Sequence, residues 1–309
     1  MLTRREALAS MTLAAGAAVV PLACKRQQDA EIGTNFRYSL NTSTILGKSN
    51  GIERDIKIAS QAGFDYIEVW IRDIEAYVNG GNTIGSLRGY TEANGLKIAS
   101  AIGFAPWMTG GEEGFEQMER EMNLLAELGC PRIAAPPAGV DGSEALDLFE
   151  IGERYRKLLE LGRKTGVMPQ LEFWGASTAL WHMGQVLMIV AASGDPDARI
   201  LPDVYHMFRG GSDFNTLKMI NGSLIDLFHI NDYPADKARL EQNDADRVFP
   251  GEGAAPLSTI LSDLHTMGGE KILSLELFNR EYWEEDPLDI ARTGLEKMKS
   301  AVNAAINAK

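Results

Sequence analysis

The sequence predicts an α/β protein built as a (β/α)8 TIM barrel, and three observations carry that prediction. After residue 33 the chain contains eight short runs with the length and apolar pattern of strands. Helical sequence follows each run, and this alternation implies a parallel sheet with helical crossovers. Eight such units span a length close to the roughly 250 residues that are typical of such a barrel. A doubly wound open sheet is the alternative, but Asn41-Thr-Ser-Thr44 after the first strand is no glycine-rich phosphate loop.

The elements follow one another without a break in composition. The predicted strands lie at 36–45, 64–71, 97–104, 131–136, 167–174, 199–204, 224–231 and 271–278. The predicted helices lie at 51–62, 86–93, 114–128, 143–165, 178–192, 214–220, 256–267 and 287–307. Glycines such as Gly63 and Gly129 are expected to end helices, and Ser143 and Asp286 are expected to cap the helices that they precede.

Residues 1–33 are expected to be a twin-arginine-type signal peptide and linker ahead of one catalytic barrel at 34–309. Thr3-Arg4-Arg5 resembles an export motif, and the apolar run 7–23 is short for a membrane span. Pro21-Leu-Ala-Cys24 resembles a lipoprotein cleavage site, so Cys24 is the expected lipid anchor and Cys130 a free thiol. The expected location is the periplasm, free or as an anchored lipoprotein. An amphipathic N-terminal helix of a cytosolic protein is the alternative.

Composition narrows the classes of partner. Hydrophobic residues make up 45% of the 309 residues, which allows a sizeable core. The net charge of −13 argues against nucleic acid as a partner, because binding phosphates needs a basic surface. Two cysteines make neither a disulfide framework nor a cysteine-rich zinc site. Whether the chain forms a homo-oligomer is left open.

Four consecutive predicted strands end in residues that bind metals, namely Glu172, Asp203, His229 and Glu276. In a (β/α)8 barrel these strand ends meet at the face that carries the active site. Three carboxylates and one imidazole favour one divalent cation, either Mn²⁺, Mg²⁺, Co²⁺ or Zn²⁺. Without a cation, buried carboxylates at such a site would repel one another.

Each of these residues also has a purely structural interpretation. Glu172 or Glu276 could pair with a basic residue such as Arg132, and His229 could be a buried histidine with satisfied hydrogen bonds. Asp203 could cap the segment that follows it. Four such residues at matching strand ends favour the metal site over these separate explanations.

Three further segments carry a family resemblance, namely Asp203-Val-Tyr-His206, Phe228-His-Ile-Asn-Asp-Tyr-Pro234 and Asp246-Arg-Val-Phe-Pro-Gly-Glu-Gly253. Through them the chain resembles the xylose-isomerase-like TIM barrel superfamily of sugar isomerases and epimerases, over residues 36–307. The resemblance implies that the four strand-end residues hold one divalent metal ion. It also implies that Glu172 and Glu276 remove and return a proton on carbon.

The expected substrate-binding residues follow from the resemblance and from their places at strand ends, and they are His206, Arg247, Glu252, Trp70, Trp107 and Trp174. His206 would hold substrate oxygens, and Arg247 and Glu252 would contact the substrate or close the site. Turn chemistry alone also explains Pro250-Gly-Glu-Gly253. The three tryptophans either stack on a sugar ring or pack in the core or rim.

The expected function is metal-dependent isomerisation or epimerisation of a sugar, keto-sugar or cyclitol through an enediolate. The first alternative is a lyase or dehydratase that acts on a 3-keto-glycoside or an inosose-like substrate by the same proton abstraction. The second is an envelope carbohydrate-binding protein without turnover. An apurinic-site endonuclease is disfavoured, because its zinc cluster needs more histidines than these strand ends offer.

Overall fold

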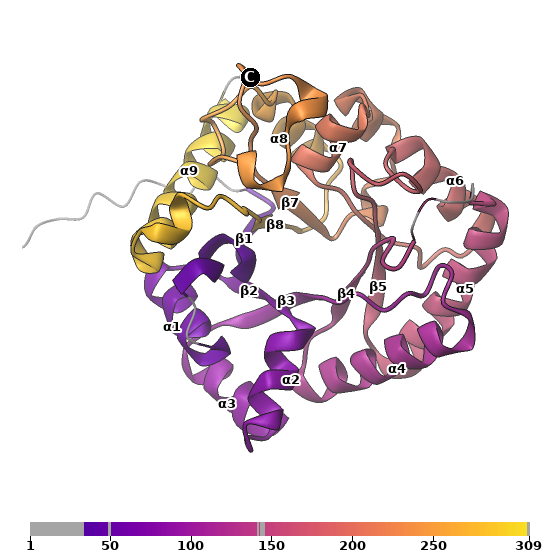
Figure 1. The fold of residues 1–309 in the computed structure, drawn as a ribbon. Helices are drawn as coiled ribbons and strands as arrows, with labels where there is room; N and C mark the ends of the chain where they lie inside the picture. Colours follow the sequence, from indigo (N-terminus) through magenta and orange to yellow (C-terminus); the bar gives the residue numbers. More distant parts are fainter. Residues whose placement is uncertain (1–33, 49–50, 141, 143–145, 308–309) are drawn as a thin grey trace, which may run out of the picture. The chain divides into compact units, whose positions relative to one another are not determined.

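The computed structural model describes residues 34–48, 51–140, 142 and 146–307. Eight parallel strands form a ring with helices around it, which confirms the predicted TIM barrel (Figure 1). The strands are β1 (Phe36–Asn41), β2 (Tyr66–Trp70), β3 (Lys97–Ile102), β4 (Arg132–Ala135), β5 (Met168–Glu172), β6 (Ile200–Leu201), β7 (Leu227–Ile230) and β8 (Lys271–Leu275). The predicted signal peptide and linker, with the lipid anchor at Cys24, lie outside the described residues.

The ring closes through two of the predicted site residues. The strands run in the order β6-β5-β4-β3-β2-β1-β8-β7. Between β6 and β7 the contact is a single parallel bridge from Asp203 to His229, in which the His229 N–H donates to the Pro202 carbonyl at 2.9 Å. Closure of the barrel therefore places a carboxylate and an imidazole side by side.

The helices cover the outside of the strand ring. They are α1 (Ile52–Ala62), α2 (Ile71–Asn79), α3 (Ile84–Ala93), α4 (Gly111–Leu128), α5 (Leu148–Thr165), α6 (Met183–Ser193), α7 (Val204–Gly210), α8 (Leu257–Thr266) and α9 (Pro287–Asn307). Short 3-10 segments are η1 (Thr42–Lys48), η2 (Phe214–Met219), η3 (Gly222–Leu224), η4 (Arg239–Glu241), η5 (Asp244–Asp246) and η6 (Tyr282–Glu284). The main hydrophobic core lies between the strands and these helices.

Several element boundaries differ from the prediction for local reasons. The helix α2 begins at Ile71, directly after β2, although the apolar run predicted a strand up to residue 71. The first residues of α2 continue the apolar pattern of the strand, so the sequence does not mark where the helix begins. The helix α5 is capped by Asp147, whose Oδ1 accepts the Phe149 N–H at 2.9 Å, and the predicted cap Ser143 lies outside the described residues. Asp286 caps α9 as predicted, because its Oδ1 accepts the Leu288 N–H at 2.9 Å.

Trp107 is a core residue and not a sugar-stacking residue. Its side chain is 0% exposed, its Nε1–H donates to the Pro136 carbonyl at 3.0 Å, and its ring packs 6.0 Å from that of Tyr155. The expectation that it contacts substrate is therefore wrong. A tryptophan that follows a strand can turn inward as readily as outward, and the sequence pattern of a loop does not distinguish the two.

We expect Trp107→Ala to lower the free energy of unfolding by about 3–5 kcal/mol, because the change leaves a large cavity and an unpaired Pro136 carbonyl. Urea unfolding followed by circular dichroism measures the loss. Trp181, which is 39% exposed, is the matched control, and Trp181→Ala should cost about 1 kcal/mol or less. Equal losses in the two variants would contradict the placement of Trp107 in the core.

Two further properties of the described residues concern hydropathy and the free cysteine. No helix in the described part of the chain combines the length and the apolar character that a membrane span requires. Cys130 is a free, buried thiol, as expected, and burial raises its pKa to about 12. The thiolate is the reactive form, and burial disfavours it at Cys130.

Candidate functional site

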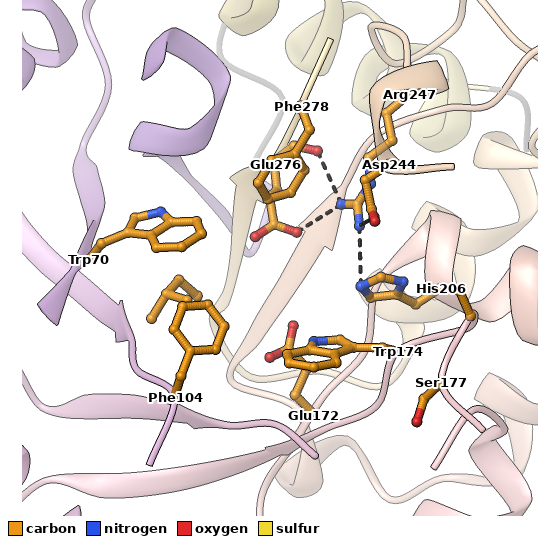
Figure 2. Close-up of a pocket in the computed structure, with 12 residues that line it drawn as sticks. Trp70, Phe104, Glu172, Trp174, Ser177, His206, Asp244, Arg247, Glu276 and Phe278 are labelled. Atoms are coloured by element: carbon orange, nitrogen blue, oxygen red, sulfur yellow. Dashed lines mark hydrogen bonds and ion pairs between the residues drawn. The ribbon is translucent and has the colours of Figure 1, made fainter. Parts of the chain in front are cut away.

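A cavity of about 390 Å³ opens at the carboxyl ends of the strands. Figure 2 shows the side chains that line it. Six of the predicted site residues are among them, namely Glu172, His206, Arg247, Glu276, Trp70 and Trp174. The fold thus brings most of the predicted site to one place, as expected for a (β/α)8 barrel.

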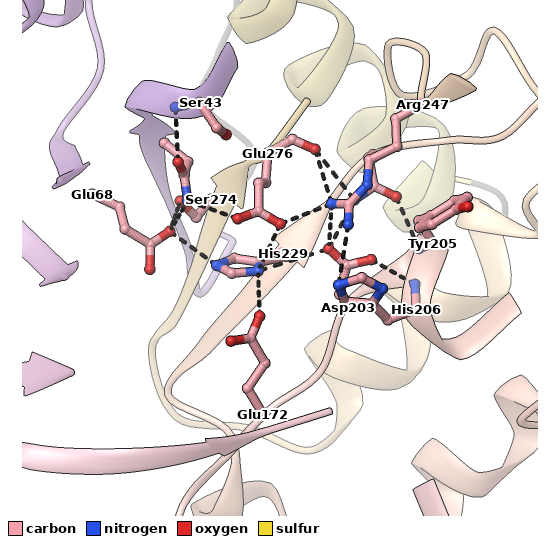
Figure 3. A network of polar contacts seen from close by, with 12 residues as sticks. Ser43, Glu68, Glu172, Asp203, Tyr205, His206, His229, Arg247, Ser274 and Glu276 are labelled. Atoms are coloured by element: carbon pink, nitrogen blue, oxygen red, sulfur yellow. Dashed lines mark hydrogen bonds and ion pairs between the residues drawn. The ribbon is translucent and has the colours of Figure 1, made fainter. Parts of the chain in front are cut away.

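The predicted metal ligands converge on one nitrogen atom. Ligand atoms of Asp203, His229 and Glu276 all lie within 4.8 Å of one another. His229 Nδ1 is 3.2 Å from Glu276 Oε2, 3.7 Å from Asp203 Oδ2 and 3.9 Å from Glu172 Oε1 (Figure 3). This nitrogen is buried and has no hydrogen-bond partner. A buried imidazole nitrogen without a partner, facing three carboxylates, fits a divalent cation as its missing partner.

The surroundings of Glu172 and Glu276 shift the pKa values of these two carboxyl groups in opposite directions. Burial raises the pKa of Glu172 to about 8, and the neighbouring carboxylates of Glu276 and Asp203 add to that effect. Burial acts in the same direction on Glu276, but the positive charges of His229 and Arg247 hold its pKa below the usual value. Burial opposes the charge on His229, yet the carboxylates of Glu276 and Glu68 raise its pKa well above the ordinary range.

Arg247 is a buried member of the site that is already paired with carboxylates. Its Nη1 donates to Asp203 Oδ2 at 2.9 Å and to Glu276 Oε2 at 2.8 Å, and its Nη2 donates to Asp244 Oδ1 at 2.7 Å. The side chain is 0% exposed. Arg247 therefore orients two of the candidate ligands, and the sequence analysis missed Asp244 as the third carboxylate that holds it.

His206 lies beside this arginine at the wall of the cavity. Asp203 caps α7, because its Oδ1 accepts the His206 N–H at 2.8 Å, while its Oδ2 faces the metal-binding cluster. The predicted cap is thus confirmed, and the role of Asp203 as a metal ligand stays a prediction. Burial lowers the pKa of His206 to about 4, so its ring is neutral at pH 7.

Glu252 lies outside the cavity, and its predicted contact with substrate is wrong. Its carboxylate is 2.7 Å from Lys297 Nζ in α9. The reason is the turn around it, which Asp232 stabilises by accepting the N–H groups of Gly251 at 3.0 Å and Ala255 at 2.8 Å. The Pro-Gly-Glu-Gly segment is therefore turn chemistry, as the alternative interpretation held.

Glu68 is a member of the site that the sequence analysis missed. It is 0% exposed in β2, and its Oε2 lies 3.0 Å from His229 Nε2. The same oxygen accepts hydrogen bonds from Asn41 Nδ2 at 3.0 Å and from Ser274 Oγ at 2.7 Å. A carboxylate on Nε2 keeps a proton on that atom, so Nδ1 is the nitrogen that would bind a divalent cation. Glu68 lies within the apolar strand Tyr-Ile-Glu-Val-Trp, and no other carboxylate, histidine or cysteine stands in that strand at a spacing typical of metal sites, so the sequence did not identify it.

We expect Glu68→Gln to weaken divalent-metal binding by about 10- to 100-fold, because the tautomer and the basicity of His229 depend on the carboxylate. Competition titration of Zn²⁺ against a chelator measures the affinity. Ser274→Ala removes one hydrogen bond to the same carboxylate and keeps its charge, so its effect should be smaller. Unchanged metal affinity in Glu68→Gln would remove Glu68 from the site.

Comparison with known proteins identifies the family. The model of the xylose isomerase-like TIM barrel family matches residues 56–301. The chain is 26% identical over 276 residues to an inosose isomerase of Bacillus velezensis, which covers 87% of this chain and 98% of that protein. It is also 25% identical over 256 residues to a 3-dehydroshikimate dehydratase of Pseudomonas aeruginosa. That match covers 79% of this chain and 38% of the dehydratase.

Solved structures show the same fold. A structure of the IolI protein with a bound zinc atom superposes with a TM-score of 0.79 at 24% identity, over 86% of this chain and 98% of that one. An L-ribulose 3-epimerase superposes with a TM-score of 0.70 at 19% identity, over 88% of this chain and 96% of that one. Because the family model matches residues 56–301, which is most of this chain, the chain belongs to the xylose isomerase-like TIM barrel family.

Proposed function

We propose that the chain is a divalent-metal-dependent isomerase or epimerase that acts on a sugar, keto-sugar or cyclitol. The observation that carries the proposal is the pair of carboxyl groups in the cavity. Burial raises the pKa of Glu172 to about 8, whereas positive neighbours lower the pKa of Glu276. The surroundings of the two carboxyl groups therefore move their pKa values in opposite directions. An acid and a base at one cavity are what proton transfer between two carbon positions or two faces of one carbon requires.

In the proposed reaction, Glu276 takes the proton from the carbon next to the substrate carbonyl. The electron pair of that C–H bond moves into the new carbon–carbon double bond, and the carbonyl electrons move onto oxygen to give an enediolate. Glu172 then donates its proton to carbon, and the two carboxyl groups have exchanged protonation states. In epimerisation this proton enters the opposite face of the same carbon. In isomerisation it enters the former carbonyl carbon, while the proton of the neighbouring hydroxyl group moves to the enediolate oxygen. A divalent ion held by Asp203, His229 and Glu276 supplies, when bound, a positive charge that stabilises the developing negative charge on oxygen.

The relatives support this class of reaction. Inosose isomerases of two Bacillus species each share 26% identity with the chain, over 81% or more of its length. A lyase is the second candidate function, and the similarity to 3-dehydroshikimate dehydratases favours it. In that reaction the same proton is removed, but the electron pair expels a leaving group from the next carbon and no proton returns to carbon.

Metal content and proton exchange together test the proposal. Elemental analysis of the purified full chain should find about one divalent ion per chain. The metal-loaded protein is then incubated in D₂O with a panel of ketoses, inososes and 3-keto-glycosides. An isomerase or epimerase incorporates deuterium at the carbon next to the carbonyl, whereas a lyase releases an unsaturated product. Metal without any turnover would favour the carbohydrate-binding protein, and no uptake of Mn²⁺, Co²⁺ or Zn²⁺ would overturn the metal-dependent enzyme.

We also propose that the chain is exported through the twin-arginine pathway and works in the periplasm, free or anchored at Cys24. The support is the Thr3-Arg4-Arg5 motif, the apolar run 7–23 and Cys24 itself. Cell fractionation tests this proposal. The variant with Arg4→Lys and Arg5→Lys should accumulate in the cytoplasm, and an unchanged distribution would contradict twin-arginine export.

A further inference from the structure

One side of the cavity is a continuous aromatic wall. Its members come from four strand ends and are Phe278, Trp70, Phe104 and Trp174. Ring centroids are 6.3 Å apart for Phe278 and Trp70, 5.4 Å for Trp70 and Phe104, and 6.1 Å for Phe104 and Trp174. Figure 2 shows Trp70 and Phe104 across the cavity from His206, Asp244 and Arg247. The polar side of the cavity is thus opposed by an apolar surface.

Apart from the proposed metal ion, the charged side chains at the cavity leave no free cation for an anionic substrate. Among the described residues that line it, Arg247 is the one basic side chain, and Glu172, Asp244 and Glu276 are acidic. The guanidinium of Arg247 already donates to three carboxylates within 2.7–2.9 Å. A phosphate or carboxylate of a substrate would have to displace one of them.

His206 and the rim do not change this balance. The Nδ1 atom of His206 accepts the Gly175 N–H at 3.3 Å, and its Nε2 lies 3.2 Å from Arg247 Nη2, so each ring nitrogen already faces a protein N–H group. Arg72 stacks on Trp70 with its guanidinium carbon 4.1 Å from the ring centroid, but it pairs with Asp73 at 3.7 Å and does not line the cavity.

We infer that this site takes an uncharged ring substrate that bears an apolar group, such as the aglycone of a keto-glycoside, and that it rejects phosphorylated and carboxylated analogues. The inference rests on the proposed function, because it places the reacting carbonyl at the polar side. The apolar group then lies on the aromatic wall, where burial and ring stacking stabilise it. An anionic group on the aromatic wall would lose its hydration and gain no cationic side chain as a partner.

The inference separates the two kinds of relative. An inosose is an uncharged ring ketone, whereas 3-dehydroshikimate carries a carboxylate. The cavity of this chain has aromatic rings and occupied hydrogen-bonding groups where a carboxylate would need a free arginine or lysine. The uncharged class is therefore the one that its chemistry fits.

Matched pairs of compounds test the inference on the full, metal-loaded protein. An inosose is compared with its monophosphate, and methyl 3-keto-glucoside with the 4-nitrophenyl 3-keto-glucoside. We expect kcat/KM to be at least 100-fold higher for the uncharged inosose than for its phosphate, and at least tenfold higher for the aryl than for the methyl glycoside. Equal or greater activity on the phosphate would overturn the inference and leave the proposed function in place.

If no compound turns over, the proposed function fails, and calorimetric binding of the same pairs still tests the inference. Binding of the uncharged aryl glycoside but not of the phosphate would support it. Binding of the phosphate alone, or of none of the compounds, would overturn it.

A charge placed on the aromatic wall should reverse the preference. Phe104 is 44% exposed at the rim, so a polar residue is tolerated there. Phe104→Arg should improve activity on the phosphate at least tenfold, whereas the control Phe104→Leu should lose the preference for the aryl glycoside and still reject the phosphate. Circular dichroism confirms folding, and Phe104→Lys replaces the arginine variant if that protein does not fold. A properly folded basic variant without gain on the phosphate would contradict the inference.

Discussion

Replacing Asp203 with asparagine is expected to lower the affinity for divalent metal by at least about 100-fold and to abolish turnover, while the barrel still folds. The Oδ2 atom of Asp203 faces His229 Nδ1 at 3.7 Å and accepts from Arg247 Nη1 at 2.9 Å. Its Oδ1 caps α7 by accepting the His206 N–H at 2.8 Å, and asparagine caps helices equally well. The variant thus removes the charge and keeps the cap. Elemental analysis of the purified variant measures the loss of metal.

Asp213 provides the matched control for this variant. It caps η2 in the same way, with its Oδ1 accepting the Asn215 N–H at 2.9 Å on an exposed surface. Asp213→Asn should therefore keep the metal content and the activity of the parent protein. Full metal content in Asp203→Asn would show that the carboxylate cluster is structural and that the ion, if present, binds elsewhere.

Glu172→Gln and Glu276→Gln are each expected to lower kcat by about 100- to 10,000-fold, because each variant removes one of the two groups proposed to move the proton. The two variants should differ in their metal content. Glu276 Oε2 lies 3.2 Å from His229 Nδ1, and Glu276 belongs to the cluster with Asp203 and His229. Glu172 Oε1 lies 3.9 Å from the same nitrogen, and Glu172 is not part of that cluster. Glu172→Gln should therefore keep more of its metal, and its loss of deuterium exchange in D₂O then reports on proton transfer alone.

Glu252→Gln is the control for these substitutions. Glu252 was predicted at the substrate but pairs with Lys297 outside the cavity, so its amide variant should keep kcat and KM. Near-normal activity in a folded Glu172→Gln or Glu276→Gln protein would remove the two-carboxylate mechanism.

Most of the fold and the central residues of the site followed from the sequence for a geometric reason. In a ring of parallel strands the carboxyl ends share one face, so residues at matching strand ends meet whatever their separation in sequence. Asp203, His229 and Glu276 are therefore found together, with Glu172 beside them. Their roles as metal ligands and proton carriers stay predictions that the experiments above test.

The remaining residues could not be placed, because loops and strand interiors carry no such rule. Trp107 follows a strand, as Trp174 does, yet one ring turns into the core and the other lines the cavity. Glu68 lies inside β2, where a lone carboxylate has many partners available to it. Asp244 begins the short 3-10 segment η5, and the sequence pattern of that loop does not show that its carboxylate reaches Arg247.

The single bridge between β6 and β7 is a place where closure of the barrel can be followed at one backbone amide, that of His229. The His229 amide donates across this seam to Pro202, and the flanking strand pairs each share longer ladders. Opening of the ring at this bridge exposes that amide to hydrogen exchange without unfolding the other strands. An ion shared by Asp203 and His229 would tie the two sides of the seam together. Binding of the ion should therefore slow hydrogen exchange at the His229 amide, so that this one amide reports both on closure of the barrel and on occupancy of the site.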